Sequence, residues 1–215
     1  MGMMINRRRV IGYKKGLLPS GYKQVEYIEN TSNAYIETDY YGTYGDELEI
    51  VYKSNHTNNN FVIGWGDGDY TNYNDGVYNG LYAAFQSNSV QVAYNRNFLN
   101  LSLNVQSKHT YLYKVVNNVP LILVDGVIKY EGSATGASPD LHQRLDIFTS
   151  KAWTTYANIY AKGQCYSFMI KRNNKALYHF IPCISPNNIV GLYDIVNHKF
   201  YSSPNGIAFV AGPEV

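Results

Sequence analysis

Apolar and polar residues alternate at a period of two in several segments, and this alternation constrains the fold more than any other feature. In DELEIVYK, residues 46–53, the apolar Leu48, Ile50 and Tyr52 alternate with the charged Glu47, Glu49 and Lys53. Successive side chains of a β-strand point to opposite faces, so the pattern predicts a strand with one buried face. The same period recurs in three later segments, at residues 90–94, 101–106 and 111–115.

Turn-forming residues separate the apolar runs. Asp125-Gly126 lies between PLILV and VIKYEG, and Asp-Gly between two apolar runs is among the strongest hairpin signals. Arg172-Asn173-Asn174 divides CYSFMIKRNNKALYHFI in the same way, which predicts a second hairpin. The sequence therefore predicts strands that are joined in antiparallel pairs.

Helical signals are scarce in this chain. No stretch holds an apolar helical stripe with a cap at each end, and we expect at most one helical turn, at residues 140–145. The 215 residues include 22 Tyr and 18 Gly, which favour strands and turns respectively. Because a single all-β domain commonly has this length, we expect an all-β fold, a two-sheet antiparallel sandwich.

Basic charge is concentrated at the N-terminus. The first 15 residues hold five basic side chains and no acidic one, whereas the rest holds 13 basic and 16 acidic residues. We interpret residues 1–16 as an extended arm that anchors the chain to a partner, and residues 17–215 as the folded domain. A solvated terminus is the alternative, and no aromatic-interleaved basic surface follows to favour nucleic acid. The predicted anchor residues are Arg7, Arg8, Arg9, Lys14 and Lys15.

The two cysteines, Cys165 and Cys183, are too few for a disulfide framework or a zinc site, and each lies in an apolar run. We therefore expect two buried free thiols. No segment approaches the roughly 20 apolar residues of a membrane helix, and no signal-peptide pattern follows the first basic residues. We expect no membrane association and no export signal in this sequence.

One loop carries the chemistry of a binding site. The stretch WGDGDYTNYNDGVYNG, residues 65–80, combines aromatic rings that can stack on a sugar with oxygen ligands of the kind that calcium prefers. It lacks the closing Glu of an EF-hand loop, and the alternative is a turn-rich loop whose acidic side chains face water, so no cofactor is required. The candidate glycan-binding residues are Trp65, Tyr70, Tyr73 and Tyr78. The candidate calcium ligands are Asp67, Asp69, Asn72 and Asp75.

Three segments, in order along the chain, resemble one known family. They are LPSGYKQVEYIENTSNAYIETDY, LILVDGVIKYEG, and FIPC with GLYDIVNHKFYSS near the end. Together they are similar to the concanavalin A-like lectin/glucanase sandwich in its laminin-G-like form, as found on structural proteins of phages and prophages of gut bacteria. The resemblance spans residues 17–212 and implies a jelly roll of two curved antiparallel sheets.

By this resemblance, the C-terminal segment forms the closing strands of the sandwich. Phe180 and Ile181 are expected to end one strand, because Pro182 has no amide proton for the ladder. Residues 185–188 are expected to cross over to a strand at residues 191–193. This segment is therefore predicted to be architectural.

We expect no catalysis. Glucanases of the resembled superfamily carry their two carboxylates on one strand as Glu-x-Asp-x-x-Glu, and the sequence does not contain this pattern. Ser-His-Asp, P-loop and paired-histidine metal motifs are also absent from the sequence. Surface or hydrogen-bonded polar roles are expected for the five scattered histidines, His56, His109, His142, His179 and His198.

The resemblance implies a non-enzymatic virion structural protein, a phage head-fibre or capsid-decoration subunit. Its arm is expected to dock on capsid or other virion proteins, and its lectin-like sandwich to project from the particle surface for adhesion, with a host surface glycan as a candidate ligand. We expect a homo-oligomer, a dimer or a trimer, because most oligomers of soluble proteins are symmetric homo-oligomers. The alternatives are a carbohydrate-binding surface domain or tail receptor-binding domain, and a degenerate glucanase.

Overall fold

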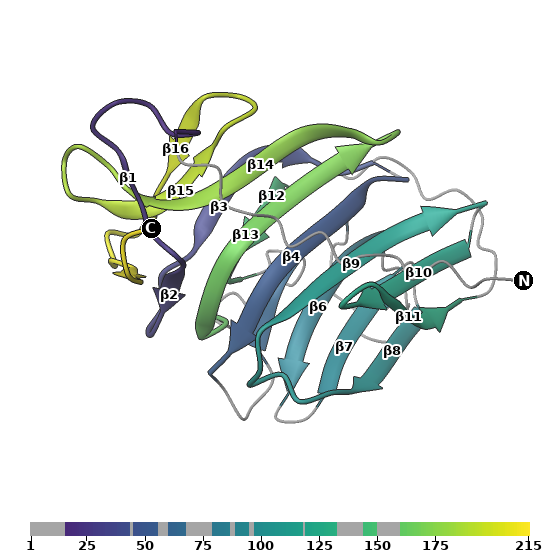
Figure 1. The fold of residues 1–215 in the computed structure, drawn as a ribbon. Coiled ribbons are helices and arrows are strands. Elements are labelled where there is room, and N and C mark those ends of the chain that lie inside the picture. The colour runs from purple at the N-terminus through teal and green to yellow at the C-terminus, as the bar shows by residue number, and fades with distance from the viewer. Residues whose placement is uncertain are drawn as a thin grey trace, which may run out of the picture.

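Two antiparallel β-sheets make up the described part of the chain (Figure 1). The computed structural model describes residues 16–43, 45–55, 60–67, 79–86, 89–94, 97–117, 119–132, 144–149 and 160–215. Every regular element within these ranges is a β-strand, and the strands pair antiparallel throughout. The predicted all-β, two-sheet antiparallel sandwich is therefore confirmed.

Among the described residues, the larger sheet has 11 strands, and the smaller sheet, which lies behind it in Figure 1, has six. The larger sheet contains β1 (Lys23–Gln24), β2 (Ile28–Asn30), β4 (Glu47–Ser54), β9 (His109–Val116), β10 (Val119–Val124), β11 (Val127–Glu131), β13 (Gly163–Arg172), β14 (Lys175–Ile184), β15 (Val190–Asp194), β16 (Lys199–Tyr201) and β17 (Val210–Ala211). Its main path runs β11-β10-β9-β4-β13-β14-β15-β16. The smaller sheet contains β3 (Ile36–Tyr41), β12 (Arg144–Ile147), β5 (Asn60–Asp67), β6 (Asn79–Gln86), β7 (Ser89–Tyr94) and β8 (Asn97–Ser102), in that spatial order.

The buried alternate face of each strand builds the core. Along β4, Leu48, Ile50 and Tyr52 are at most 4% exposed, which confirms the alternation predicted for this segment. Phe168 of β13 and Phe180 of β14 are fully buried and stack with ring centroids 5.6 Å apart. Burying a side chain of this size contributes about 1.5–3 kcal/mol. The apolar period read from the sequence therefore marks the residues that hold the sandwich together.

Both predicted hairpins are present. Asp125 and Gly126 have φ of 51° and 78°, and Asn173 and Asn174 have φ of 50° and 62°. Two consecutive residues of positive φ are the mark of a type I′ turn, whose twist matches that of the flanking strands. The turns join β10 to β11 and β13 to β14, as the sequence predicted.

The predicted strand at residues 101–106 is wrong in its second half, because β8 ends at Ser102. A turn follows, in which the Asn104 side-chain oxygen accepts a backbone hydrogen bond of 3.2 Å from two residues further on. Val105 is fully buried in this turn, and its carbonyl accepts the amide proton of Ser54 at 2.9 Å. The apolar spacing here reflects a turn packed on the core rather than a strand.

The predicted helical turn at residues 140–145 is wrong where the structure describes it. Residues 144–147 form β12, with Leu145 and Ile147 fully buried, while residues 140–143 lie outside the described ranges. β12 pairs with β3 on one side and β5 on the other. Pairing with these two strands fixes an extended conformation that the local sequence does not signal.

The expected end of a strand before Pro182 is also wrong, because β14 continues to Ile184. Pro182 lies where β14 changes its neighbour, since β13 pairs as far as Phe180 and β1 pairs from Cys183. The Pro182 carbonyl accepts the amide proton of Val25 at 3.1 Å, so its ring nitrogen faces this junction. The missing amide proton therefore removes no bond from a continuous ladder.

Residues 185–188 form a hairpin turn and not the expected crossover. The amide of Asn188 donates to the carbonyl of Ser185 at 2.9 Å, and the amide of Ser185 donates to Ile189 at the same distance. Asn188 has a φ of 60°, a conformation that Asn tolerates well. The chain then returns as β15 directly beside β14, so the predicted strand at residues 191–193 is confirmed.

Cys165 and Cys183 are fully buried free thiols, as the sequence predicted. Burial raises the pKa of each thiol to about 12. Within the described ranges, the chain contains no helix of the length and apolarity needed to cross a membrane.

Candidate functional site

The predicted glycan-binding loop connects two strands at one end of the smaller sheet. β5 ends at Asp67, which lies opposite Asn79, the first residue of β6, and Trp65 lies opposite Leu81. The backbone therefore places both ends of the loop side by side. The other predicted ligands fall outside the described residues and stay predictions: Tyr70, Tyr73, Tyr78, Asp69, Asn72 and Asp75.

Two further residues lie at the same end of the smaller sheet. Tyr41, the last residue of β3, lies opposite Arg144, the first residue of β12. β12 runs antiparallel to β5 with Asp146 opposite Gly64, so Arg144 lies toward the end of the sheet at which Asp67 stands. Tyr41 is 51% exposed and offers an apolar ring with a polar hydroxyl to the solvent. This end, defined by Tyr41, Arg144, Asp67 and Asn79, is the candidate site.

Sequence reasoning did not find Tyr41 or Arg144. The two residues are distant from each other and from the loop along the chain, and no spacing connects them. Only the pairing of β3, β12 and β5 brings them to one end of the sheet. An exposed Tyr at the end of a strand is a weak signal in a chain with 22 of them.

A carboxylate pair lies beside the candidate site. Glu37 of β3 is directly opposite Asp146 of β12, and cross-strand neighbours have Cβ atoms about 4.5–5.5 Å apart. Retaining glycosidases also place two carboxyl groups close together, about 5–5.5 Å apart. However, Asp146 has no exposed surface, and Glu37 forms an ion pair with Arg144. A carboxylate that a sugar cannot reach is unsuited to act as nucleophile or acid in this arrangement.

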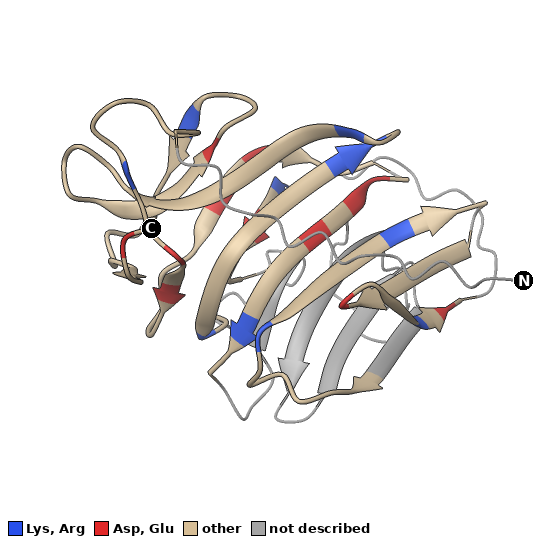
Figure 2. Cartoon of the chain, in the orientation of Figure 1, with Lys and Arg blue, Asp and Glu red and all other residues tan. Residues whose placement is uncertain are grey.

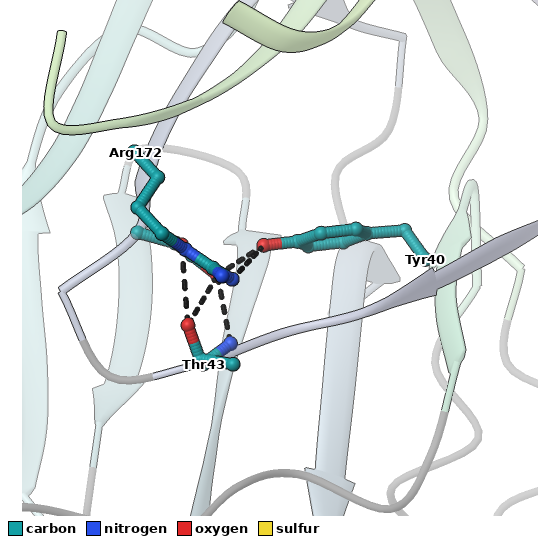
Figure 3. Close-up of polar contacts among 4 residues, drawn as sticks. Tyr40, Thr43 and Arg172 are labelled. Atoms are coloured by element: carbon teal, nitrogen blue, oxygen red, sulfur yellow. Dashed lines mark hydrogen bonds and ion pairs between the residues drawn. The ribbon is translucent and has the colours of Figure 1, made fainter. Parts of the chain in front are cut away.

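A buried polar cluster fixes the end of β3 next to Tyr41 (Figure 3). The side chain of Asp46 is 1% exposed and accepts hydrogen bonds from Arg172 Nε at 2.7 Å, from the Thr43 amide at 2.7 Å and from the Tyr40 hydroxyl. The hydrogen bond to Asp46 raises the pKa of Arg172, while burial and the same carboxylate raise the pKa of Tyr40. The ion pair of Asp46 and Arg172 holds the β3 end in place.

A second cluster ties β3 to the larger sheet. Asp39 accepts hydrogen bonds from Tyr201 at 2.6 Å, from Tyr178 at 3.2 Å and from Lys199 Nζ at 2.8 Å. Burial alone raises the pKa of Asp39, but the hydrogen bonds from Lys199 and Tyr201 outweigh it, and the net pKa lies below the usual value. Burial and Asp39 in turn raise the pKa of Tyr178 to about 12. The network links the edge of the smaller sheet to β14 and β16.

Charges of both signs are interspersed over the described strands (Figure 2). On the larger sheet, Lys171 Nζ lies 3.2 Å from Glu49 Oε2, and each belongs to a neighbouring strand. The predicted anchor residues of the arm fall outside the described residues, as does the arm itself up to residue 15. Their role stays a prediction.

The described histidines do not gather into a site. His109 lies with Nδ1 2.8 Å from Asp125 Oδ2 and Nε2 3.0 Å from the Asn104 carbonyl, which makes it a hydrogen-bonded polar residue as predicted. His56 and His142 fall outside the described ranges. Among the described residues, no group of three His, Cys, Asp or Glu side chains is placed to hold a metal ion. A calcium site in the loop stays a prediction.

No protein-family model matches the chain, and no curated protein matches it. Solved structures with similar folds include a heptameric SAP-like pentraxin from Limulus polyphemus, at 7% identity over 69% of this chain and 74% of that one, with a TM-score of 0.47. They also include the CBM40 of a Ruminococcus gnavus IT-sialidase, at 11% identity over 68% and 90%, with a TM-score of 0.49. A prokaryotic β-1,3-1,4-glucanase from a mouse hindgut metagenome is 13% identical over 62% and 68%, with a TM-score of 0.41.

The described sheets of this chain have the two-sheet antiparallel architecture that the resemblance implied. At these identities the likeness concerns fold alone.

Proposed function

We propose that the chain is a non-enzymatic virion structural protein, a phage head-fibre or capsid-decoration subunit. Its N-terminal arm docks on a capsid or other virion protein, and its sandwich is displayed on the particle surface. The displayed sandwich recognises a surface glycan through the end of the smaller sheet that Tyr41, Arg144, Asp67 and Asn79 define.

The observation that carries the glycan role is the convergence at this end. Topology brings the loop predicted from sequence, the exposed Tyr41 and the ion-paired Arg144 to one place, although they come from three separate parts of the chain. Carbohydrate recognition needs an apolar ring face together with hydrogen-bonding groups, and this end supplies both. The clusters around Asp46 and Asp39 make β3 a rigid support for Tyr41.

The separation of charge supports the docking role. The coloured strands have interspersed charges of both signs (Figure 2). In the sequence, residues 1–15 hold five basic residues and no acidic one. The described strands lie between Lys23 and Ala211, and the arm precedes them in the sequence. A basic arm of this kind is suited to an acidic groove on another protein.

Truncation of residues 1–16 tests the docking role, with the amount of protein on purified phage particles as the readout. We expect the truncated chain to keep its circular dichroism spectrum and to lose particle association. Unchanged association would place attachment in the sandwich and remove the arm as an anchor. Binding of the full chain to a printed glycan array tests the glycan role separately, and the absence of any bound glycan contradicts that role alone.

A hydrolysis assay separates the proposal from the glucanase alternative. Incubation with mixed-linkage β-glucan is expected to release no reducing sugar, because Asp146 is buried and Glu37 is ion-paired. Release of sugar that disappears in Glu37→Gln would make the chain a glycoside hydrolase.

A further inference from the structure

The edge strands of the two sheets differ in how they are protected. An edge strand exposes unpaired backbone groups that recruit other strands, and proteins protect such edges by short length, charge, bulges or cover. β3 is tied to β14 and β16 through Asp39, and β16 has three residues and begins with Lys199. β11 carries Lys129 and Glu131, and its pairing with β10 contains a register shift. Three of the four strands at the ends of the two sheet orders, β3, β11 and β16, are therefore protected.

β8 at the fourth end has neither a charged residue nor a bulge. It pairs with β7 from Asn97 to Ser102 without a register shift, and its sequence NFLNLS contains no charge and no proline. Within the described residues, no strand pairs with its other side. A strand of this kind is a site for strand addition.

Hairpin geometry determines which backbone groups of β8 are available. Only residues 95 and 96 separate β7 from β8, so Tyr94 and Asn97 form the hydrogen-bonded pair that closes a two-residue turn. Hydrogen-bonded and non-hydrogen-bonded pairs alternate along an antiparallel ladder. The residues whose backbone amide and carbonyl face the open edge are therefore Phe98, Asn100 and Ser102.

We propose that β8 pairs antiparallel with β8 of a second copy of this chain, about a two-fold axis at Asn100. In this register Asn100 pairs with Asn100 of the second copy, and Phe98 pairs with Ser102 in both directions. Each residue whose backbone faces the open edge then gains a hydrogen-bonded partner. The smaller sheets of the two copies become one continuous sheet.

The charge pattern favours a second copy as the occupant. In a two-fold antiparallel pair, the residue on the axis meets itself, so a charged residue there repels its counterpart. β8 has no charge at any position, whereas the same pairing at the centre of β11 sets Lys129 against itself. A charged strand from another protein gains no ion pair from β8. The two-fold pairing also agrees with the commonest symmetry of homo-oligomers.

Sedimentation velocity of the full chain, over a concentration series, is the first test. The wild-type chain is expected to be a dimer, and Asn100→Pro is expected to weaken dimerisation by about 10-fold or more, because two backbone hydrogen bonds are lost at the axis. The matched control is Ile128→Pro, which places proline on the outer edge of β11 next to the hairpin-closing pair of Val124 and Val127. Ile128→Pro should leave the dimer intact. A monomeric or trimeric wild-type chain overturns the proposal.

Disulfide trapping tests the register and does not need a proline. Cα atoms across a hydrogen-bonded antiparallel pair are about 5.5 Å apart, within the range that a disulfide spans. Asn100→Cys is expected to cross-link to its counterpart under mild oxidation, whereas Asn97→Cys, about 20 Å from its counterpart in this register, is not. The native Cys165 and Cys183 are buried and do not compete. Equal cross-linking at both positions, or none at Asn100→Cys, overturns the proposed pairing.

Discussion

Arg172 at the end of β13 holds the buried carboxylate of Asp46, with Nε 2.7 Å from Oδ1. The same guanidinium lies 3.3 Å from the Tyr40 hydroxyl, so one cation satisfies two groups that come from a different part of the chain. Tyr40 faces the core and its neighbour Tyr41 faces solvent. The cluster therefore connects the stability of the sandwich to the geometry of the candidate site.

Replacing Arg172 with Ala is expected to lower the free energy of unfolding by about 2–3 kcal/mol, because the Asp46 carboxylate loses its charged partner while remaining buried. Urea denaturation followed by tyrosine fluorescence measures this loss. The control is Lys175→Ala, an exposed residue at the start of β14, which should change stability by less than about 0.5 kcal/mol. Equal effects of the two substitutions would show that the Asp46 pair contributes nothing specific.

The stability of the protein should fall in acid partly through Asp39. Its pKa in the folded state lies below the usual value of an aspartate, because hydrogen bonds from Lys199 and Tyr201 outweigh burial. A carboxyl group with a depressed pKa stabilises the fold fully above its unfolded pKa, and this contribution is lost as the pH falls through the folded pKa. In the Asp39→Asn variant the side chain at this position cannot titrate. The free energy of unfolding of the variant should therefore depend less steeply on pH below about 4 than that of the wild-type chain. Urea denaturation of both proteins across this range measures the difference, and identical slopes would contradict the assignment.

Local sequence patterns predicted the fold well where the signal and the structure are both local. The alternation of apolar and polar residues predicted β4. The turn-forming residues predicted the hairpins at Asp125 and Asn173, where the structure has positive φ. The errors arose where a distant partner decides the outcome. Pro182 stays within a strand because β14 changes from β13 to β1 at that residue, and Val105 is buried by packing of a turn.

The candidate site was only half predictable for the same reason. The loop at residues 65–80 has a composition that indicates binding, and that composition is visible in the sequence. Tyr41 and Arg144 lie near this loop only because β12 pairs with β3 and with β5. The two residues are far apart in the sequence, and no local pattern encodes such a pairing. The same holds for Glu37 and Asp146, because a search along single strands cannot find carboxylates that face each other across two strands.

Both thiols should be unreactive in the folded protein. Cys165 and Cys183 have no exposed surface, and burial raises the pKa of each to about 12, so almost no thiolate forms at pH 8. Ellman's reagent is expected to label neither residue in buffer and both in concentrated urea. Rapid labelling of one thiol in buffer would show that the sheet around it opens on the timescale of the assay.

The exposed ring of Tyr41 should contribute to glycan binding and little to stability. Tyr41→Ala removes an aromatic surface that is half exposed, so we expect retention on an array glycan bound by the wild-type chain to weaken by about 10-fold or more, with the melting temperature almost unchanged. Tyr41→Phe keeps the ring and should retain most of the binding if stacking dominates. The matched control is Val116→Ala at the end of β9, a residue of the larger sheet that is 41% exposed and lies outside the candidate site. If Val116→Ala weakens binding as much as Tyr41→Ala does, the candidate site is misplaced, since the two substitutions share only the loss of exposed apolar surface.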